Sequence, residues 1–302
     1  MKRALVEMYL LEFVKRVYFL LIVIYFLGCN SPNLEYEESI QEWHQARINY
    51  LKSEEGFVNL AGLFWLNEGT NTFGSDSTNA INFTSKSAPK MGSFLLNDSL
   101  VYLISTIEIV VDGKIAPDTT LVFVNGKTKN MEYKSLFWFV VKRGERFGIR
   151  LRDFESELLN DFDSIDYFKT DEDWRLEALW KPYDELLEIP FSNVLGMNIN
   201  YLVHGAFYFK IDGNEFKLEP LGLPDQYGYF VMFYDQTSGH STYGSGRYLY
   251  VDIPDKMGNT YVDFNKAFNP PCAFTEFATC LFPHKENRLP IFVKAGEKFS
   301  SH

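Results

Sequence analysis

The chain has 302 residues, of which 46% are hydrophobic and 17% aromatic, and its formal net charge at pH 7 is -11. This composition is too apolar for a disordered chain, and the length allows one large or two medium domains with a full core. The negative charge, with Lys and Arg scattered along the chain, argues against nucleic acid or anionic lipid as a partner.

An uninterrupted apolar run, VYFLLIVIYFL at residues 17–27, follows two basic residues and precedes Gly28 and Cys29. The run is shorter than the about 20 residues of a transmembrane helix, and its flanks are typical of an export signal. Gly28-Cys29 resembles the bacterial lipoprotein box, in which the Cys becomes the lipidated N-terminus. We therefore expect residues 1–28 to be a lipoprotein-type signal peptide and Cys29 the lipidation site. An uncleaved anchor helix is the alternative.

This interpretation places the mature protein in the cell envelope, anchored to the membrane by its N-terminal lipid and facing the periplasm or the surface. Residues 29–38 are expected to form a flexible tether. Ser39 is then expected to cap a helix. The apolar face of that helix follows from helical spacing and comprises Ile40, Trp43, Arg47, Tyr50 and Leu51.

From Gly56 onward, short runs of strand-forming residues alternate with turn residues, as in a β-sandwich. Asp112-Gly113 and Asn125-Gly126 are the strongest hairpin signals. The turn chemistry of residues 69–83 faintly resembles forkhead-associated sandwiches. Ser75 stands where the phosphate-binding Arg of that family should be, so phosphopeptide binding is not expected. Residues 39–155 are predicted to form the N-terminal helix and a β-sandwich.

The acidic stretch that begins at Phe154 is predicted to be a solvated connection, because its carboxylates lack the spacing and Gly of a calcium loop. A second β domain is predicted over residues 156–302. It should contain a buried strand at Tyr229–Asp235, a hairpin of Arg247–Ile253 with Thr260–Lys266, and a closing strand at Leu289–Lys294. The fold class is therefore mainly β, with two packed sandwich or barrel-like units and one N-terminal helix.

Side chains capable of chemistry concentrate between Asp235 and Arg288, interleaved with aromatic residues and with turn-forming Gly and Pro. The candidate ligand-binding residues are Tyr243, Arg247, Asn265, Asn269 and Arg288. Arg247 and Lys266 are expected at the open end of the predicted hairpin, close to Arg288.

The same stretch offers a catalytic interpretation. Asp263 and Glu286 could form a carboxylate pair, with Tyr243 or Lys266 supplying a proton and an arginine stabilising negative charge. Each residue also has a structural role open to it, as a buried ion pair or as a partner for turn amides.

Cys272 and Cys280 form an even pair in the oxidising space that the export signal implies. A disulfide between them would close a short loop. A catalytic thiol and two unpaired buried cysteines are the alternatives.

Standard catalytic and cofactor motifs are missing from the sequence, and the histidines never pair at metal-ligand spacing. No metal and no cofactor are therefore predicted.

Several longer segments carry a specific resemblance: TYGSGRYLY, DFNKAFNPPCAF and ENRLPIFVKAGEK, with GLFWLNEG and GSDSTNAINF nearer the front. Together they resemble the uncharacterised bacterial family called domain of unknown function 1684, over residues 42–298. The resemblance implies an exported or secreted β-rich protein, often lipid-anchored, with no assigned activity.

The functional prediction is an exported lipoprotein that binds a small polar ligand, such as a sugar, in a pocket of the C-terminal domain. A hydrolase that uses the carboxylate pair is one alternative, and a structural protein of the envelope is another.

Overall fold

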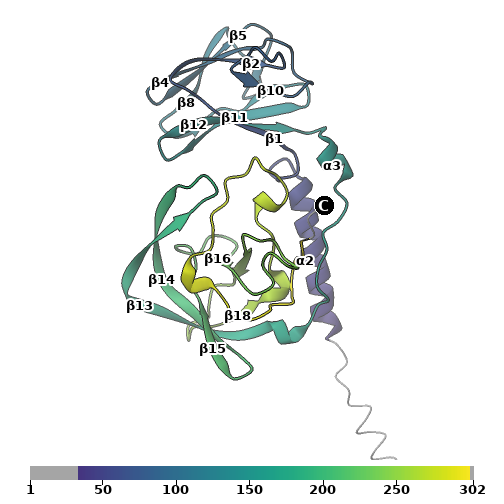
Figure 1. Ribbon diagram of the computed structural model, residues 1–302, viewed down its shortest axis with the longest axis vertical. Helices are drawn as coiled ribbons and strands as arrows, with labels where there is room; N and C mark the ends of the chain where they lie inside the picture. The colour runs from purple at the N-terminus through teal and green to yellow at the C-terminus, as the bar shows by residue number, and fades with distance from the viewer. Residues whose placement is uncertain (1–32, 300–302) are drawn as a thin grey trace, which may run out of the picture. The chain divides into compact units, whose positions relative to one another are not determined.

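The computed structural model describes residues 33–299, so the predicted signal peptide and Cys29 lie outside the described residues (Figure 1). The chain separates into two compact units, residues 1–42 and 43–302, and the described part of the first unit is the beginning of one helix. In the part of the chain that the structure describes, no helix combines the length and the apolarity that crossing a bilayer requires.

Helix α2 (Leu34–Lys52) begins five residues before the predicted cap. The Asn33 side chain accepts a hydrogen bond from the Tyr36 N–H at 3.4 Å, and two glutamates occupy the first turn, where the helix dipole favours negative charge. Ser39 lies inside the helix and donates its hydroxyl to the Tyr36 carbonyl at 2.7 Å. The predicted cap at Ser39 is therefore wrong, and residues 34–38 are helical.

Two six-stranded sheets follow helix α2, and all their strand pairs are antiparallel except β2 with β3. The first sheet has the order β1 (Leu60–Trp65), β12 (Arg146–Asp153), β11 (Leu136–Arg143), β10 (Met131–Tyr133), β6 (Val110–Val111), β7 (Lys114–Ile115). The second has the order β3 (Ile81–Asn82), β2 (Gly69–Gly74), β4 (Gly92–Asn97), β5 (Leu100–Ser105), β8 (Thr119–Val124), β9 (Lys127–Thr128).

One hydrophobic core joins these two sheets. Phe73 and Phe94 of the second sheet stack at 4.4 Å, and Phe73 also contacts Trp138 of the first sheet edge-on at 6.2 Å. All three side chains are fully buried. The predicted mainly β fold with a sandwich is thereby confirmed.

The predicted turns at Asp112-Gly113 and Asn125-Gly126 are hairpin turns. In each turn both residues have positive φ, which the type I′ hairpin requires. Asp212-Gly213 makes the same turn between β14 and β15.

The acidic connection contains the short helix α3 (Glu157–Asp161), which Ser156 caps through its hydroxyl, and the 3-10 turn η1 (Glu172–Trp174). It leads into a four-stranded sheet with the order β15 (Asn214–Leu218), β14 (Asn198–Ile211), β13 (Arg175–Ser192), β18 (Asn259–Asp263). A bulge between Pro182 and Leu187 interrupts the long β13–β14 hairpin, which is strongly curved (Figure 1).

A separate two-stranded sheet pairs β16 (Tyr229–Phe233) with β17 (Arg247–Val251). Three further 3-10 turns follow: η2 (Phe264–Lys266), η3 (Pro271–Ala273) and η4 (Lys285–Asn287). Phe207 and Phe209 of β14, Phe233 of β16 and Leu249 of β17 are fully buried with Phe264 in a second core.

Two predicted strand pairings are wrong. β17 pairs with β16 and β18 pairs with β13, so the two do not form a hairpin. No regular strand forms over residues 289–294, where Pro290 lacks an N–H and the Asp235 carboxylate binds the Val293 N–H at 2.9 Å. Residues 287–291 instead make three main-chain hydrogen bonds with residues 234–236, and the side chains of Asp235 and Arg247 bind the main chain of Val293.

Candidate functional site

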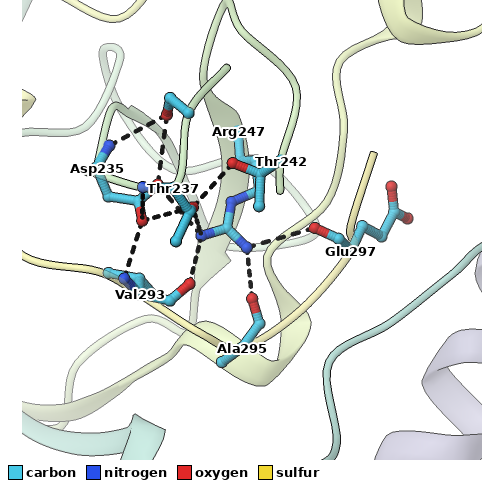
Figure 2. Close-up of polar contacts among 8 residues, drawn as sticks. Asp235, Thr237, Thr242, Arg247, Val293, Ala295 and Glu297 are labelled. Atoms are coloured by element: carbon cyan, nitrogen blue, oxygen red, sulfur yellow. Dashed lines mark hydrogen bonds and ion pairs between the residues drawn. The ribbon is translucent and has the colours of Figure 1, made fainter. Parts of the chain in front are cut away.

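Arg247, the first residue of β17, is completely buried, and Figure 2 shows its polar contacts. Its guanidinium donates to three main-chain carbonyls of the C-terminal segment, those of Val293 at 2.9 Å, Ala295, and Glu297 at 3.4 Å. It also forms an ion pair with Asp235 at 3.3 Å. The Arg247 Nε has no acceptor among the described residues, but the three bonds from the other two nitrogens tie Arg247 to the main chain of residues 293–297.

Asp235 is the acidic partner and organises the loop after β16. Its Oδ2 accepts the Thr237 N–H at 3.1 Å, the Thr237 hydroxyl at 2.7 Å and the Val293 N–H. The Thr237 hydroxyl also lies 2.9 Å from that of Thr242 (Figure 2). Arg247 is thereby connected to Thr242, which lies on the wall of a pocket described below.

A second buried ion pair joins Glu297, which is fully inaccessible, to Arg47 of helix α2. The Arg47 Nε donates to Glu297 Oε1 at 3.0 Å, and the Asn269 N–H donates to Oε2 at 2.7 Å. Burial raises the pKa of the Glu297 carboxyl, and Arg47 offsets this effect only in part. The Arg47 guanidinium also stacks over the Phe268 ring at 4.7 Å.

Asn269 is the predicted ligand-binding residue closest to this second pair. Only 2% of it is exposed. Its side-chain amide donates to the Lys298 carbonyl at 3.0 Å, and its Oδ1 accepts no hydrogen bond from the described residues. Glu297 therefore fixes the backbone of Asn269. The side-chain oxygen of Asn269 remains an unused acceptor.

The remaining predicted residues fall into separate groups. Asp263 ends β18 and accepts the Asn265 N–H at 3.1 Å, while Asn265 binds the main chain of Asp171 at 2.8 Å. Lys266 is partly exposed, with its Nζ 3.9 Å from Asp263. These contacts stabilise turn η2, and none of them joins Arg247.

Arg288, Glu286 and Tyr243 lie in other surroundings. The exposed Arg288 stacks over the Tyr234 ring at 4.6 Å, and Glu286 is 3.9 Å from Lys285. The Tyr243 hydroxyl donates to the Cys272 carbonyl at 3.1 Å. Among the described residues, no hydrogen bond or ion pair joins Asp263 to Glu286, the pair on which the hydrolase hypothesis depends.

Cys272 and Cys280 form a disulfide, with Cα atoms 6.1 Å apart. The Cys272 N–H points at the Cys280 sulfur at 3.0 Å. On the chain-entropy estimate, a loop this short adds about 2.5 kcal/mol of stability. The disulfide closes the segment that follows Asn269.

A cluster around Glu219 was not predicted from the sequence. The Glu219 carboxylate, 2% exposed, accepts hydrogen bonds from the Tyr183 hydroxyl and from Lys217 Nζ, the latter at 2.7 Å. Its other oxygen lies 3.2 Å from His284 Nε2. Asn287 binds both the N–H and the carbonyl of Glu219, at 2.8 and 2.7 Å.

Burial lowers the pKa of His284, although the Glu219 charge acts in the opposite direction. Burial and Glu219 together raise the pKa of Tyr183 to about 12. Glu219 follows the end of strand β15, Tyr183 lies in the bulge of β13, and Asn287 lies in turn η4. In sequence, Tyr183 is 36 residues and Asn287 68 residues from Glu219, so no local pattern could have grouped them.

Two pockets adjoin at Asp166, Lys298 and Phe299, which line both. The first has a volume of 460 Å³ and is walled by the loop from Gly239 to Gly244. The second has a volume of 520 Å³. Its other lining residues are Leu158, Asp161, Phe162, Asp163, Ser164, Ile165, Asn269, Ala273 and Phe274.

Main-chain hydrogen bonds hold the shared wall in place. The Lys298 N–H donates to the Asp166 carbonyl at 2.7 Å, and the Phe299 N–H donates to the Ser241 carbonyl at 3.0 Å. Glu297, the preceding residue, is fixed by Arg47. We name this double pocket the Lys298 pocket.

A larger concave surface of 1030 Å³ covers part of β13, β14 and β18. The charged side chains that line it are all exposed, and its buried lining residues, Ala178 and Phe209, are apolar. No buried polar residue lines this surface, whereas the buried polar residues Asn269 and Thr242 line the Lys298 pocket.

Residues 160–298 match a protein family described as "Protein of unknown function (DUF1684)". The match confirms the expected resemblance for these residues, which are the C-terminal part of the range expected from the sequence. Among solved structures, the chain is similar to the solution NMR structure of an uncharacterised protein of Haloarcula marismortui. The two are 28% identical over 47% of this chain and 80% of that chain, with a TM-score of 0.39. No curated protein matches the chain.

Proposed function

We propose that this chain, whose residues 160–298 match the DUF1684 family, binds a small polar ligand in the Lys298 pocket. The observation that carries the proposal is the buried Arg47–Glu297 pair, which holds Asn269 on the pocket wall. Of the residues predicted from the sequence to bind ligand, Asn269 is therefore the one that we retain.

The cost of burying the ions supports this interpretation. Arg47, Glu297, Arg247 and Asp235 are each at most 9% exposed, and a buried ion pair adds little or nothing to stability compared with apolar residues of the same volume. What such a pair provides is a fixed geometry, which a binding site needs. The hydrogen bonds of both pairs end on pocket residues: Glu297 binds Asn269, and the Asp235–Thr237 turn binds Thr242.

The pocket offers polar groups together with apolar surface, the combination typical of small-molecule sites. Asp166 and Lys298 lie on the wall shared by both halves. Phe162, Phe274 and Phe299 supply ring surface, and Phe299 packs edge-on against Tyr243 at 5.0 Å. Tyr243 therefore supports the wall in this proposal and does not bind the ligand directly.

We also propose that the protein is exported and lipid-anchored at Cys29. The support is the apolar run at residues 17–27 with its basic flank and the Gly28-Cys29 dipeptide. Globomycin, which blocks cleavage of lipoprotein signals, should make a slower-migrating precursor accumulate in cells. A mature, unlipidated protein that keeps its N-terminal segment would contradict this part of the proposal.

The binding proposal is tested by a thermal-shift screen of the purified protein without its signal peptide, using sugars, polyols, amino acids, small amines and nucleotides. Compounds that raise the melting temperature are then titrated calorimetrically. Asp166→Ala and Lys298→Ala should each change the affinity at least about tenfold, which corresponds to about 1.4 kcal/mol of binding free energy. Lys114→Ala, in the exposed strand β7, serves as the matched surface control and should leave affinity unchanged.

Two results would overturn the binding proposal. One is the absence of any stabilising compound in the screen. The other is a bound compound whose affinity responds equally to Lys114→Ala and to the two pocket variants.

A further inference from the structure

We infer that the ligand of the Lys298 pocket is a small organic cation, such as a quaternary ammonium compound. This inference rests on the proposed binding function and specifies its ligand. Three features of the larger half of the pocket carry it: an aromatic corner, an excess of carboxylates, and an acceptor atom without a donor.

The aromatic corner is formed by Phe162 and Phe274. Their ring centroids are 5.9 Å apart and the ring planes meet at 80°, so the two rings lie nearly perpendicular to each other. Both line the pocket, as does Phe299. Aromatic faces attract cations through the ring quadrupole, and rings set at an angle are how proteins enclose methylated ammonium groups.

The carboxylates are Asp161, Asp163 and Asp166, all of which line this half of the pocket and are exposed at its rim. The lining contains one cationic side chain, Lys298, so its formal charge is -2 when the three carboxylates and one ammonium are summed. An anionic ligand would meet three like charges. A cation would be attracted into the pocket from solution.

Two other cations lie near the pocket, and both already have partners. The Lys52 ammonium donates to the Phe162 carbonyl at 2.8 Å. The Arg47 guanidinium lies 5.7 Å from the Phe274 ring and is neutralised by Glu297. Arg47 shows that this ring already accommodates a cation on one side.

The unused acceptor is Asn269 Oδ1. The residue is 98% buried, lines the pocket, and receives no hydrogen bond at this oxygen from any described residue. Its amide N–H group is occupied by the Lys298 carbonyl. The buried polar part of the wall therefore has acceptor capacity to spare, which suits a ligand that carries a hydrogen-bond donor, such as the hydroxyl of choline, better than one that offers only acceptors.

The test compares cations with a neutral isostere. Choline and 3,3-dimethyl-1-butanol have nearly the same shape, but the second carries a carbon in place of the charged nitrogen. Calorimetric titration of the same protein with each compound, and with tetramethylammonium chloride, should show binding of the cations. The neutral alcohol should bind at least about tenfold more weakly.

Pocket variants locate the effect. Asp163→Asn removes one exposed carboxylate and Phe274→Leu removes one ring face; each should weaken choline binding by about threefold to tenfold. Asp118→Asn, outside the pocket, is the matched control for charge and should change nothing. If Phe274→Leu lowers the melting temperature sharply, its choline affinity is set aside, and the affinity of the Asp163→Asn variant, whose substitution is at an exposed residue, decides whether the pocket binds the cation.

The outcomes separate this inference from the proposed function. Equal affinity for choline and its neutral isostere, or binding of a neutral sugar with no response to any cation, would overturn the cation inference and leave the binding function standing. Loss of binding of every compound class would overturn both. Preference for choline that survives Asp163→Asn and Phe274→Leu would place cation binding elsewhere and also contradict the inference.

Discussion

Arg47 and Glu297 are 250 residues apart in sequence, yet the guanidinium Nε and the carboxylate Oε1 lie 3.0 Å from each other, and both side chains are buried. This pair connects helix α2 to the last residues that the structure describes. The pair also supports the wall of the Lys298 pocket, because the Glu297 carboxylate accepts a hydrogen bond from the N–H of the lining residue Asn269.

Arg47→Met should reduce the free energy of unfolding by about 3–5 kcal/mol, because it leaves the Glu297 charge buried without a counter-ion. Adding Glu297→Gln should restore part of that loss, since the second change removes the stranded charge. Urea denaturation of the wild type, both single variants and the double variant measures this coupling. Lys142→Met is the control: its pair with Glu145 is at the surface, and less than about 0.5 kcal/mol should be lost. Additive losses in the double variant would contradict the prediction.

Arg247→Ala and Lys266→Ala should differ strongly in stability. Arg247 is fully buried and holds three carbonyls as well as Asp235, so its loss should cost at least about 3 kcal/mol. Lys266 is 37% exposed and 3.9 Å from Asp263, so its loss should cost less than about 1 kcal/mol. Chemical denaturation of the two variants checks this difference, and a similar cost for both would show that burial does not determine the role of Arg247.

Stability should fall as the pH drops below 6.5, in part through His284. Burial lowers the pKa of this residue in the folded state, so the unfolded chain binds the proton first and the loss develops between pH 6.5 and the lower folded value. The charges of Glu219 and Glu286 and the Asn287 side chain raise the pKa of His284 and so moderate the effect, whereas the charge of Lys217 lowers it further.

The measurement is urea unfolding at pH 7.5 and pH 5.5 for the wild type and His284→Gln. The variant should lose less stability between the two values than the wild type. His44, whose pKa burial also lowers, contributes equally to both proteins and cancels in the comparison. A steeper loss in the variant would reverse the sign and rule out this role for His284.

Gly296→Ala should be far more damaging than Gly213→Ala, although both glycines have positive φ, 75° and 78°. A Cβ at Gly296 would lie 2.8 Å from the Phe264 carbonyl and closer still to that of Ala267, whereas a Cβ at Gly213 would meet no atom within 4 Å. Gly213→Ala therefore carries only the backbone strain of about 1–2 kcal/mol, and Gly296→Ala should cost at least about 2 kcal/mol more. Thermal unfolding of the two variants measures the difference, and equal melting temperatures would contradict it.

The sequence was most informative where local chemistry decides the structure. Asp112-Gly113 and Asn125-Gly126 predicted hairpin turns because few other residues tolerate positive φ in succession. The mainly β class followed from the regular spacing of such turns. Helix α2 was predicted, but its start was placed too late, because Ser39 resembles a cap as much as Asn33 does.

Sequence reasoning failed where side chains replace backbone pairing. The predicted strand at residues 289–294 is apolar and β-branched enough, yet main-chain pairing with residues 234–236 ends at Ile291, and the side chains of Asp235 and Arg247 bind the Val293 main chain beyond it. Arg247 was expected to face a ligand, whereas the structure buries it among carbonyls. Partners of this kind are tens to hundreds of residues apart, and only the tertiary fold shows them.

The arrangement of the Arg47–Glu297 pair also sets an order of events as the chain enters the compartment in which it folds, N-terminus first. Helix α2 enters early, and Arg47 is without its carboxylate partner until residue 297 has followed, 250 residues later. Arg247 likewise gains its carbonyl acceptors only from residues 293–297. Contacts of such long sequence separation form slowly, so the C-terminal β domain is expected to close in one late step, after its final segment has emerged.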